Sequence, residues 1–247
     1  YCKAKKIGFL CSPFSIKAVE VLERLNVDLY KVPSGELTNT PLIQRLKKTK
    51  KHIILSTGMS DYKEIDHAAK ILKKNFSILQ CTSMYPCPII KVGLNVFKNL
   101  RRKYKCEIGY SDHTLDFSSA FAFAANGASI IEKHFTLSKK LYGSDAKHSM
   151  EQKEFKFYVD TIKDIWIINK SFVDKNKLVA FKKMKKIFEK SVVTRERVKK
   201  ETILKLKHLS FKKPGDGIRA DMYKKIIGKK TRVELPKDTK LKYSHFY

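Results

Sequence analysis

The chain has 247 residues, of which 43% are hydrophobic, and its formal net charge is +29. No apolar run approaches the roughly 18 residues that a membrane-spanning helix needs, so an integral membrane protein is not expected. Only eight of the 53 basic residues are arginine, the side chain best suited to phosphate and guanine recognition, and the basic residues are spread along the whole chain. Nucleic acid is therefore not expected as a partner.

The cysteines and the first residues bear on the cellular setting. The number of cysteines is odd and their spacing fits no zinc site, which predicts free thiols in a reducing, cytoplasmic environment. The chain begins at Tyr1 and no charged and apolar leader follows it, so a secretory signal is not expected. A start without methionine indicates a processed or truncated chain. The cysteines are Cys2, Cys11, Cys81, Cys87 and Cys106.

One unit recurs through the first 140 residues: a short apolar run ends in small polar residues and an amphipathic segment follows. Apolar residues recur at helical spacing in 18–25 and 65–72, and Gly127 is placed to end a helix that begins near Asp116. Apolar strands that alternate with helices predict a parallel sheet covered by those helices. The predicted strands are Ile7–Cys11, Leu29–Pro33, Ile53–Ser56, Phe76–Cys81, Glu107–Tyr110 and Ser129–Glu132.

Six such units leave two architectures open. A (β/α)8 barrel needs eight units, whereas an open doubly wound sheet is satisfied with six. Each predicted strand ends in a polar loop, and a barrel builds its active site from such loops, which favours the barrel. The loops are Ser12-Pro13, Ser34-Gly35-Glu36, Ser56-Thr57-Gly58, Thr82-Ser83, Ser111-Asp112-His113 and Lys133-His134.

The rest of the chain predicts a domain boundary. Apolar residues at 155, 159, 162 and 166 predict a long helix that closes the first domain, which we place at residues 1–172. A lysine-rich linker or helix is expected over 173–190. Short β-like pieces, including 191–193 and 231–235, and a Pro-Gly-Asp-Gly turn predict a small separate domain over 191–247.

Two histidines follow the last two predicted strands. Because consecutive barrel strands are neighbours, His113 and His134 can converge at the mouth of the barrel, where a pair of imidazoles suits a divalent metal such as Mn²⁺. Glu132 lies two residues before His134 and so faces the same way on a strand, where it can orient a water or move a proton. The alternatives are ordinary strand-end histidines and a structural carboxylate paired with a lysine.

Lys31 and a set of serines suit the recognition of phosphate or carboxylate. Lys31 ends the second predicted strand, and hydroxyls stand at matching strand ends. Any one of these serines alone is more readily explained as a helix cap or a turn residue. No phosphate-binding loop or dinucleotide-binding motif is present in the sequence. The serines are Ser12, Ser34, Ser56, Ser83 and Ser111.

Together these stretches resemble the sialic acid synthase family over residues 1–165. The segment Lys213-Pro214-Gly215-Asp216-Gly217 resembles the signature of that family's C-terminal antifreeze-like (SAF) domain. The other matching stretches are Lys31–Glu36, Leu55–Met59, Gln80–Pro86, Ile108–Thr114, Ile131–Thr136 and Gly143–Asp145.

The resemblance implies a TIM barrel that lacks its first two βα units, a β-rich SAF domain and a domain-swapped homodimer. It implies a condensation of phosphoenolpyruvate with an N-acylated amino sugar that releases phosphate. The implied metal ligands, for Mn²⁺ or Mg²⁺, are His113 and His134, and the acidic catalytic positions are Glu36 and Glu132. The implied phosphoenolpyruvate ligands are Ser12, Lys31, Ser34, Ser56, Ser83 and Ser111, and the sugar ligands are Tyr85, Asp145 and Lys213.

Several departures from the family pattern limit the expectation. Lys213 stands where the family usually has an arginine, which removes a planar fork of donors. Ser12 replaces a threonine and Ser83 an asparagine of some members. Because two upstream units that contribute to the site are missing, we expect weak or no activity from this chain alone. N-acetylmannosamine is the expected acceptor, with a 2,4-diacetamido-trideoxy hexose for legionaminic acid close behind, and a non-catalytic carbohydrate-binding protein is the alternative.

Overall fold

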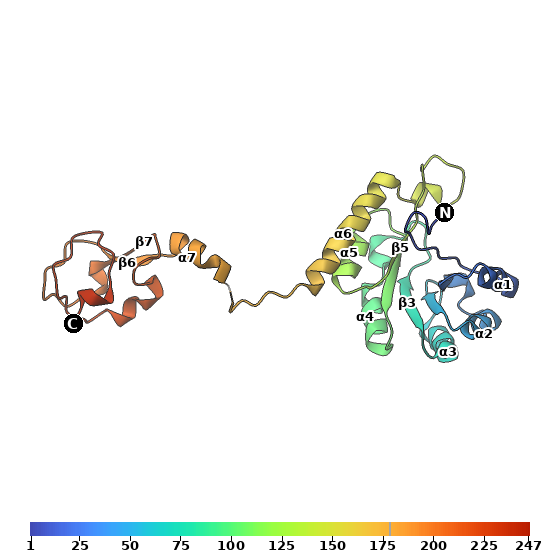
Figure 1. Cartoon of the computed structure of the whole chain (residues 1–247), viewed down its shortest axis with the longest axis horizontal. Helices are drawn as coiled ribbons and strands as arrows, with labels where there is room; N and C mark the ends of the chain where they lie inside the picture. Colours follow the sequence, from blue (N-terminus) through green and yellow to red (C-terminus); the bar gives the residue numbers. More distant parts are fainter. Residues whose placement is uncertain (178) are drawn as a thin grey trace. The chain divides into compact units, whose positions relative to one another are not determined.

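The computed structural model describes residues 1–177 and 179–247, which form two compact units, Tyr1–Ser171 and Phe172–Tyr247 (Figure 1). Residue 178, within the predicted linker, lies outside the described residues. The helices of the first unit are α1 (Ile16–Arg24), α2 (Thr40–Lys48), α3 (Tyr62–Leu72), α4 (Leu94–Lys103), α5 (Ser118–Ala125) and α6 (Gln152–Lys170). Its strands are β1 (Leu29–Val32), β2 (His52–Ser56), β3 (Phe76–Cys81), β4 (Ile108–Asp112) and β5 (Ile131–Lys133).

The five strands form one parallel sheet in the order β1-β2-β3-β4-β5. A doubly wound sheet needs a reversal of strand order, and this sheet has none. Because each strand adds on the same side of the last, right-handed crossovers place the connecting helices on one face. The sheet is therefore wound in one direction only, like part of a barrel.

An ion pair between the two edge strands shows how strongly the sheet curves. Lys31 Nζ on β1 lies 3.3 Å from Glu132 Oε2 on β5. In a flat sheet four strand spacings of about 4.8 Å would hold these edges about 19 Å apart. The sheet thus curls into a half-barrel whose concave side holds the two side chains.

The prediction of a first strand at Ile7–Cys11 is wrong. Only Cys11 pairs, through an isolated parallel bridge to Tyr30. Ile7, Phe9 and Leu10 are 64%, 50% and 40% exposed. Among the described residues this segment has no strand on its outer side, so its apolar side chains stay in contact with solvent and do not align along β1.

Successive side chains along each strand point alternately into the hydrophobic core and into the concave side of the half-barrel. Tyr30, Leu55, Ile78 and Tyr110 point to the helices and belong to one buried cluster, in which the Tyr110 ring stacks on Phe123 of α5 at 3.7 Å. The residues between them point into the half-barrel, because successive side chains on a strand face opposite ways. The sequence alternation therefore aims polar residues at the concave side.

Local capping explains where two of the helices begin and end. Asp61 and Glu64 form a capping box at the start of α3. The helix predicted to begin near Asp116 and to end at Gly127 is confirmed as α5, with the Asp116 carboxylate accepting a bond from Ser118 N and Gly127 at φ +90°. A positive φ favours glycine, which has no Cβ.

The second unit has its own core, in which Val192, Leu204 and Leu241 are among the fully buried residues. The predicted β-like piece at 231–235 forms no strand; Thr231 and Leu235 make only isolated bridges. Its elements are α7 (Lys182–Phe188), β6 (Ser191–Thr194) and β7 (Leu209–Lys212), with β6 and β7 antiparallel. Among the described residues, none of the helices is both long and apolar enough to cross a bilayer.

Candidate active site

Side chains from the carboxyl ends of all five strands line one cavity of about 570 Å³. This volume lies within the range of small-molecule binding sites. The residues predicted for the site that line the cavity are Lys31, Ser34, Ser56, Ser83, Tyr85, Ser111, His113, Glu132, His134 and Asp145.

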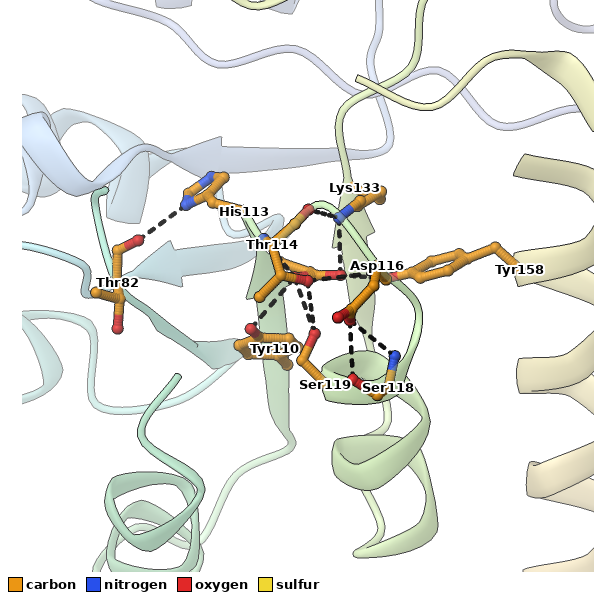
Figure 2. A network of polar contacts seen from close by, with 10 residues as sticks. Thr82, Tyr110, His113, Thr114, Asp116, Ser118, Ser119, Lys133 and Tyr158 are labelled. Carbon is orange, nitrogen blue, oxygen red and sulfur yellow. Dashed lines mark hydrogen bonds and ion pairs between the residues drawn. The ribbon is translucent and has the colours of Figure 1, made fainter. Parts of the chain in front are cut away.

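His113 and His134 lie side by side, with ring centroids 5.2 Å apart and ring planes at 88°. The ring of Tyr85 lies over both, at 4.3 Å from His113 and 5.8 Å from His134. His113 Nδ1 is 3.0 Å from the carbonyl oxygen of Thr82. Figure 2 shows this contact as a dashed line. Because a carbonyl can only accept, this nitrogen carries the hydrogen and Nε2 is the one left with a free lone pair.

The environment of His113 suits a metal ligand. Burial lowers the pKa of His113, which favours the neutral ring that coordinates metals. The carbonyl oxygen of Thr82 on Nδ1 fixes the tautomer in the way typical of ligating histidines. His134 Nδ1 lies 3.7 Å from a carboxylate oxygen of Asp145.

The donor set near the two histidines is small. Within the described residues, no group of three or more His, Cys, Asp or Glu side chains is arranged to hold a metal. A cation bound by His113 and His134 would take its other ligands from substrate and water, as an open catalytic site requires. The residues present fit such a cation.

Glu132 is held between two donors at the cavity wall. Lys31 Nζ lies 3.3 Å from Oε2, and the Ser111 hydroxyl donates to Oε1 at 3.0 Å. The sequence left open that Glu132 is a carboxylate paired with a lysine, and the pair is present. The Glu132 side chain is still 34% exposed and lines the cavity, so the carboxylate is within reach of a ligand.

The serine hydroxyls differ in what they bind. Ser34 Oγ accepts a bond from Gly58 N at 2.9 Å. The hydroxyl of Ser56, a residue only 1% exposed, has no hydrogen-bond partner within the protein, alone among the buried side-chain polar atoms of the described chain. A Cβ on Gly58 would lie 2.3 Å from Ser83 Oγ and 2.8 Å from Cys81 Sγ, so the small residue lets these groups gather.

Three predicted residues do not line this cavity. Ser12 lies in the segment that precedes α1, and Lys213 belongs to the second unit, where its ammonium is 4.9 Å from the ring centroid of Phe188. Glu36 accepts a bond from Asn39 Nδ2 at 2.7 Å, and Asn39 caps α2. The roles predicted for these three residues stay predictions.

Sequence reasoning missed some of the lining residues. Cys81 ends β3, and its thiol pKa is raised by burial. The sequence offered one signal for Cys81: it lies two residues before Ser83, and residues two apart on a strand face the same way. Phe14 and Met59, which also line the cavity, are 66% and 64% exposed. Met59 ends the matching stretch Leu55–Met59 but was not singled out, and Phe14 carried no signal in the sequence.

Comparisons with known proteins identify the family of this chain. The model of the NeuB family matches residues 1–174. N,N'-diacetyllegionaminic acid synthase of Campylobacter jejuni is 37% identical over 93% of this chain and 70% of its own. A pseudaminic acid synthase of the same species is 31% identical over 98% of this chain and 72% of its own.

A solved structure supports the fold as well. The structure of N-acetylneuraminic acid (sialic acid) synthetase from Leptospira borgpetersenii in complex with citrate is 30% identical, with a TM-score of 0.68, and covers 73% of this chain and 66% of its own. The half-barrel of five parallel strands is thus part of a TIM-barrel-like fold. On the family model and these relatives, the chain belongs to the NeuB family.

Proposed function

We propose that this chain supplies the site at which a NeuB-family enzyme condenses phosphoenolpyruvate with an N-acylated amino-sugar aldehyde. The observation that carries the proposal is the convergence of a lysine, serine hydroxyls and two histidines in one cavity. The unpartnered hydroxyl of Ser56 is part of this set. Such a buried hydroxyl costs about 1–3 kcal/mol and gains most from a charged acceptor in the cavity.

The anionic groups of phosphoenolpyruvate match the donors of the cavity wall. The Lys31 side chain is only 12% exposed, so its attraction for a phosphate or carboxylate is weakly screened. Ser34, Ser56 and Ser83 would donate to the same anion, and charge-assisted bonds of this kind are the strong ones. Tyr85 and Asp145, on the side of the two histidines, are proposed to hold the sugar.

His113 and His134 would hold a divalent cation, Mn²⁺ or Mg²⁺, which when bound supplies Lewis-acid polarisation of a carbonyl oxygen. His113 keeps its Nδ1 hydrogen on the carbonyl oxygen of Thr82, so its ring presents only Nε2 to the cavity. The Tyr85 ring lies beside both imidazoles.

The proposed condensation balances without a redox partner. Carbon 3 of phosphoenolpyruvate forms a bond to the aldehyde carbon, water adds its oxygen to carbon 2, and the bond from carbon 2 to the phosphate oxygen breaks. The two water protons end on the new sugar hydroxyl and on the released phosphate. Glu132, oriented by Lys31 and Ser111, would take a proton from that water.

N-acetylmannosamine is the proposed acceptor. A second candidate is a 2,4-diacetamido-trideoxy hexose, which is favoured by the 37% identity to the diacetyllegionaminic acid synthase. The family model ends at residue 174, and the second unit is proposed to be an SAF domain of a domain-swapped homodimer on the strength of residues 213–217. There Lys213 would reach a sugar.

The test combines binding and turnover. The full 247-residue chain is titrated with phosphoenolpyruvate in a calorimeter with Mn²⁺ present, and is then incubated with each acceptor while released phosphate and the nine-carbon product are measured. The Glu132→Gln variant should still bind phosphoenolpyruvate but form less product. Binding without product from any acceptor would agree with the weak or absent activity expected of this chain alone, and would equally fit a non-catalytic carbohydrate-binding role. Absence of phosphoenolpyruvate binding would contradict the proposal.

A further inference from the structure

A buried ion pair lies behind the two histidines, on the face of β4 and β5 that points away from the cavity. Lys133 Nζ is 3.0 Å from Asp112 Oδ2, and the two side chains are 2% and 0% exposed. Asp112 and Lys133 are register partners across the two strands. Each directly precedes a cavity residue, Asp112 before His113 and Lys133 before His134.

The Asp112 carboxylate is fully occupied by donors. Tyr158 of α6 reaches Oδ2 at 3.1 Å, so the pair also ties the closing helix to the sheet (Figure 2). Burial and the charge of Asp112 raise the pKa of Tyr158, which keeps its hydroxyl a donor. The remaining donors, all to Oδ1, are Tyr110 Oη at 3.3 Å, Thr114 N at 2.9 Å, Thr114 Oγ1 at 2.8 Å and Ser119 Oγ at 3.1 Å.

Two contacts, one from Asp112 and one from Lys133, hold the backbone that follows His113. The bond from Thr114 N to the carboxylate of Asp112 closes an Asx-type turn around the histidine between them. Lys133 also donates to the carbonyl oxygen of Thr114. The backbone after His113 is thus held through both groups of Thr114, one of them by a side chain of β5.

The pair also sets the register of a very short strand. β5 has three residues, and Asp112 and Lys133 are the last of its paired positions with β4. A slip of one residue would turn Glu132 and His134 out of the cavity, because strand side chains alternate. A buried ion pair is seldom the most stabilising choice for such a position, since apolar residues of similar volume are often as good.

We propose that Asp112 and Lys133 are positioning residues that fix the spacing of His113 and His134 and thereby the affinity of the site for a divalent cation. The inference rests on the proposed function, in which those histidines hold the cation. Asp112 and Lys133 themselves do not line the cavity. Groups that hydrogen-bond to metal-ligating side chains typically change metal affinity by about 10- to 100-fold when removed, and we expect the same range for this pair, which acts on the histidines through the backbone.

The experiment measures Mn²⁺ affinity of the full chain without substrates, from the electron paramagnetic resonance signal of free aqueous Mn²⁺. The Asp112→Asn/Lys133→Met double variant removes both charges at nearly constant volume. We expect it to bind Mn²⁺ about 10- to 100-fold more weakly than the wild type, with an altered visible spectrum of the Co²⁺ form. The matched control is Asp66→Asn/Lys103→Met, which removes an ion pair of 2.6 Å between α3 and α4 and should leave the affinity unchanged.

The outcomes separate the two proposals. Wild-type Mn²⁺ affinity in a folded double variant would overturn the positioning role and leave the proposed function standing. Absence of Mn²⁺ binding by the wild type, with the His113→Ala variant indistinguishable from it, would overturn the metal site and the inference together. If the double variant does not fold, Lys133→Met alone decides, because Asp112 keeps its other donors there; unchanged affinity in that variant would likewise overturn the inference.

Discussion

Replacing Ser56 by alanine should stabilise the protein and weaken its binding of phosphoenolpyruvate at the same time. The hydroxyl is buried and unpartnered, a state that costs about 1–3 kcal/mol, so its removal should raise the free energy of unfolding by about 1 kcal/mol after allowance for the small void. For a chain of this size that corresponds to a rise in melting temperature of about 2–4 °C.

Ligand binding should change in the opposite direction. A hydrogen bond to a charged group contributes about 1.5–3 kcal/mol, so Ser56→Ala should raise the Kd for phosphoenolpyruvate about 10- to 150-fold. Urea unfolding gives the first quantity and calorimetric titration the second. The control is Ser77→Ala on β3: its hydroxyl is paired with His52 Nε2 at 2.7 Å, and its removal should cost about 1 kcal/mol of stability without changing affinity.

Because stability should rise while affinity for phosphoenolpyruvate falls, this prediction is easy to refute. If Ser56→Ala unfolds more readily and binds phosphoenolpyruvate as the wild type does, the hydroxyl is structural and the reasoning about an unsatisfied donor is wrong. If the variant is more stable and binds equally well, the hydroxyl is unsatisfied but does not contact the ligand.

Two further substitutions test the crowding and the charge of the cavity. Gly58→Ala should cost about 1–3 kcal/mol of stability and weaken phosphoenolpyruvate binding, because the added Cβ would lie 2.3 Å from Ser83 Oγ. The control is Gly35→Ala, where the nearest contact would be at 3.6 Å and both quantities should change little. Urea unfolding measures the stability and calorimetry the binding. Lys31→Met should weaken phosphoenolpyruvate binding by more than about 10-fold. Lys51→Met, which removes an ion pair of 2.8 Å from the same unit, should leave binding unchanged, and equal effects of the two would indicate a general charge effect.

The interior of the sheet was predictable because its strands are nearly continuous apolar runs. Phe76–Cys81 was predicted at its observed bounds, and the other inner strands differ by one or two residues. Ile7–Cys11 has the same pattern but forms no strand. Periodicity reports what a segment would bury if it were paired; it carries no information about whether a neighbouring strand is there to cover it.

Most of the cavity lining could be predicted because polar residues at parallel strand ends must meet at one edge. Glu36 shows the limit of that rule, since its carboxylate binds Asn39, which caps α2, and the loop sequence has no feature that distinguishes the two uses. Asp112 and Lys133 lie in the predicted site loops, next to His113 and His134, but the sequence did not single them out. They occupy the alternate positions, and only the register of β4 with β5 makes them partners.

The alternation that separates Asp112 and Lys133 from the histidines also explains how this half-barrel can build a site from short strands. On the concave side, Glu132 and His134 need access to ligand, so they cannot be packed tightly enough to hold their own geometry. On the convex side, the next residues along the same strands are sealed beneath α5 and α6, where a charge pair is barely screened and its position is fixed by the surrounding donors. Rigidity is thus built one residue away from the chemistry and transmitted through the backbone. For this reason substitutions at such outward-facing positions should alter metal affinity before they alter the fold.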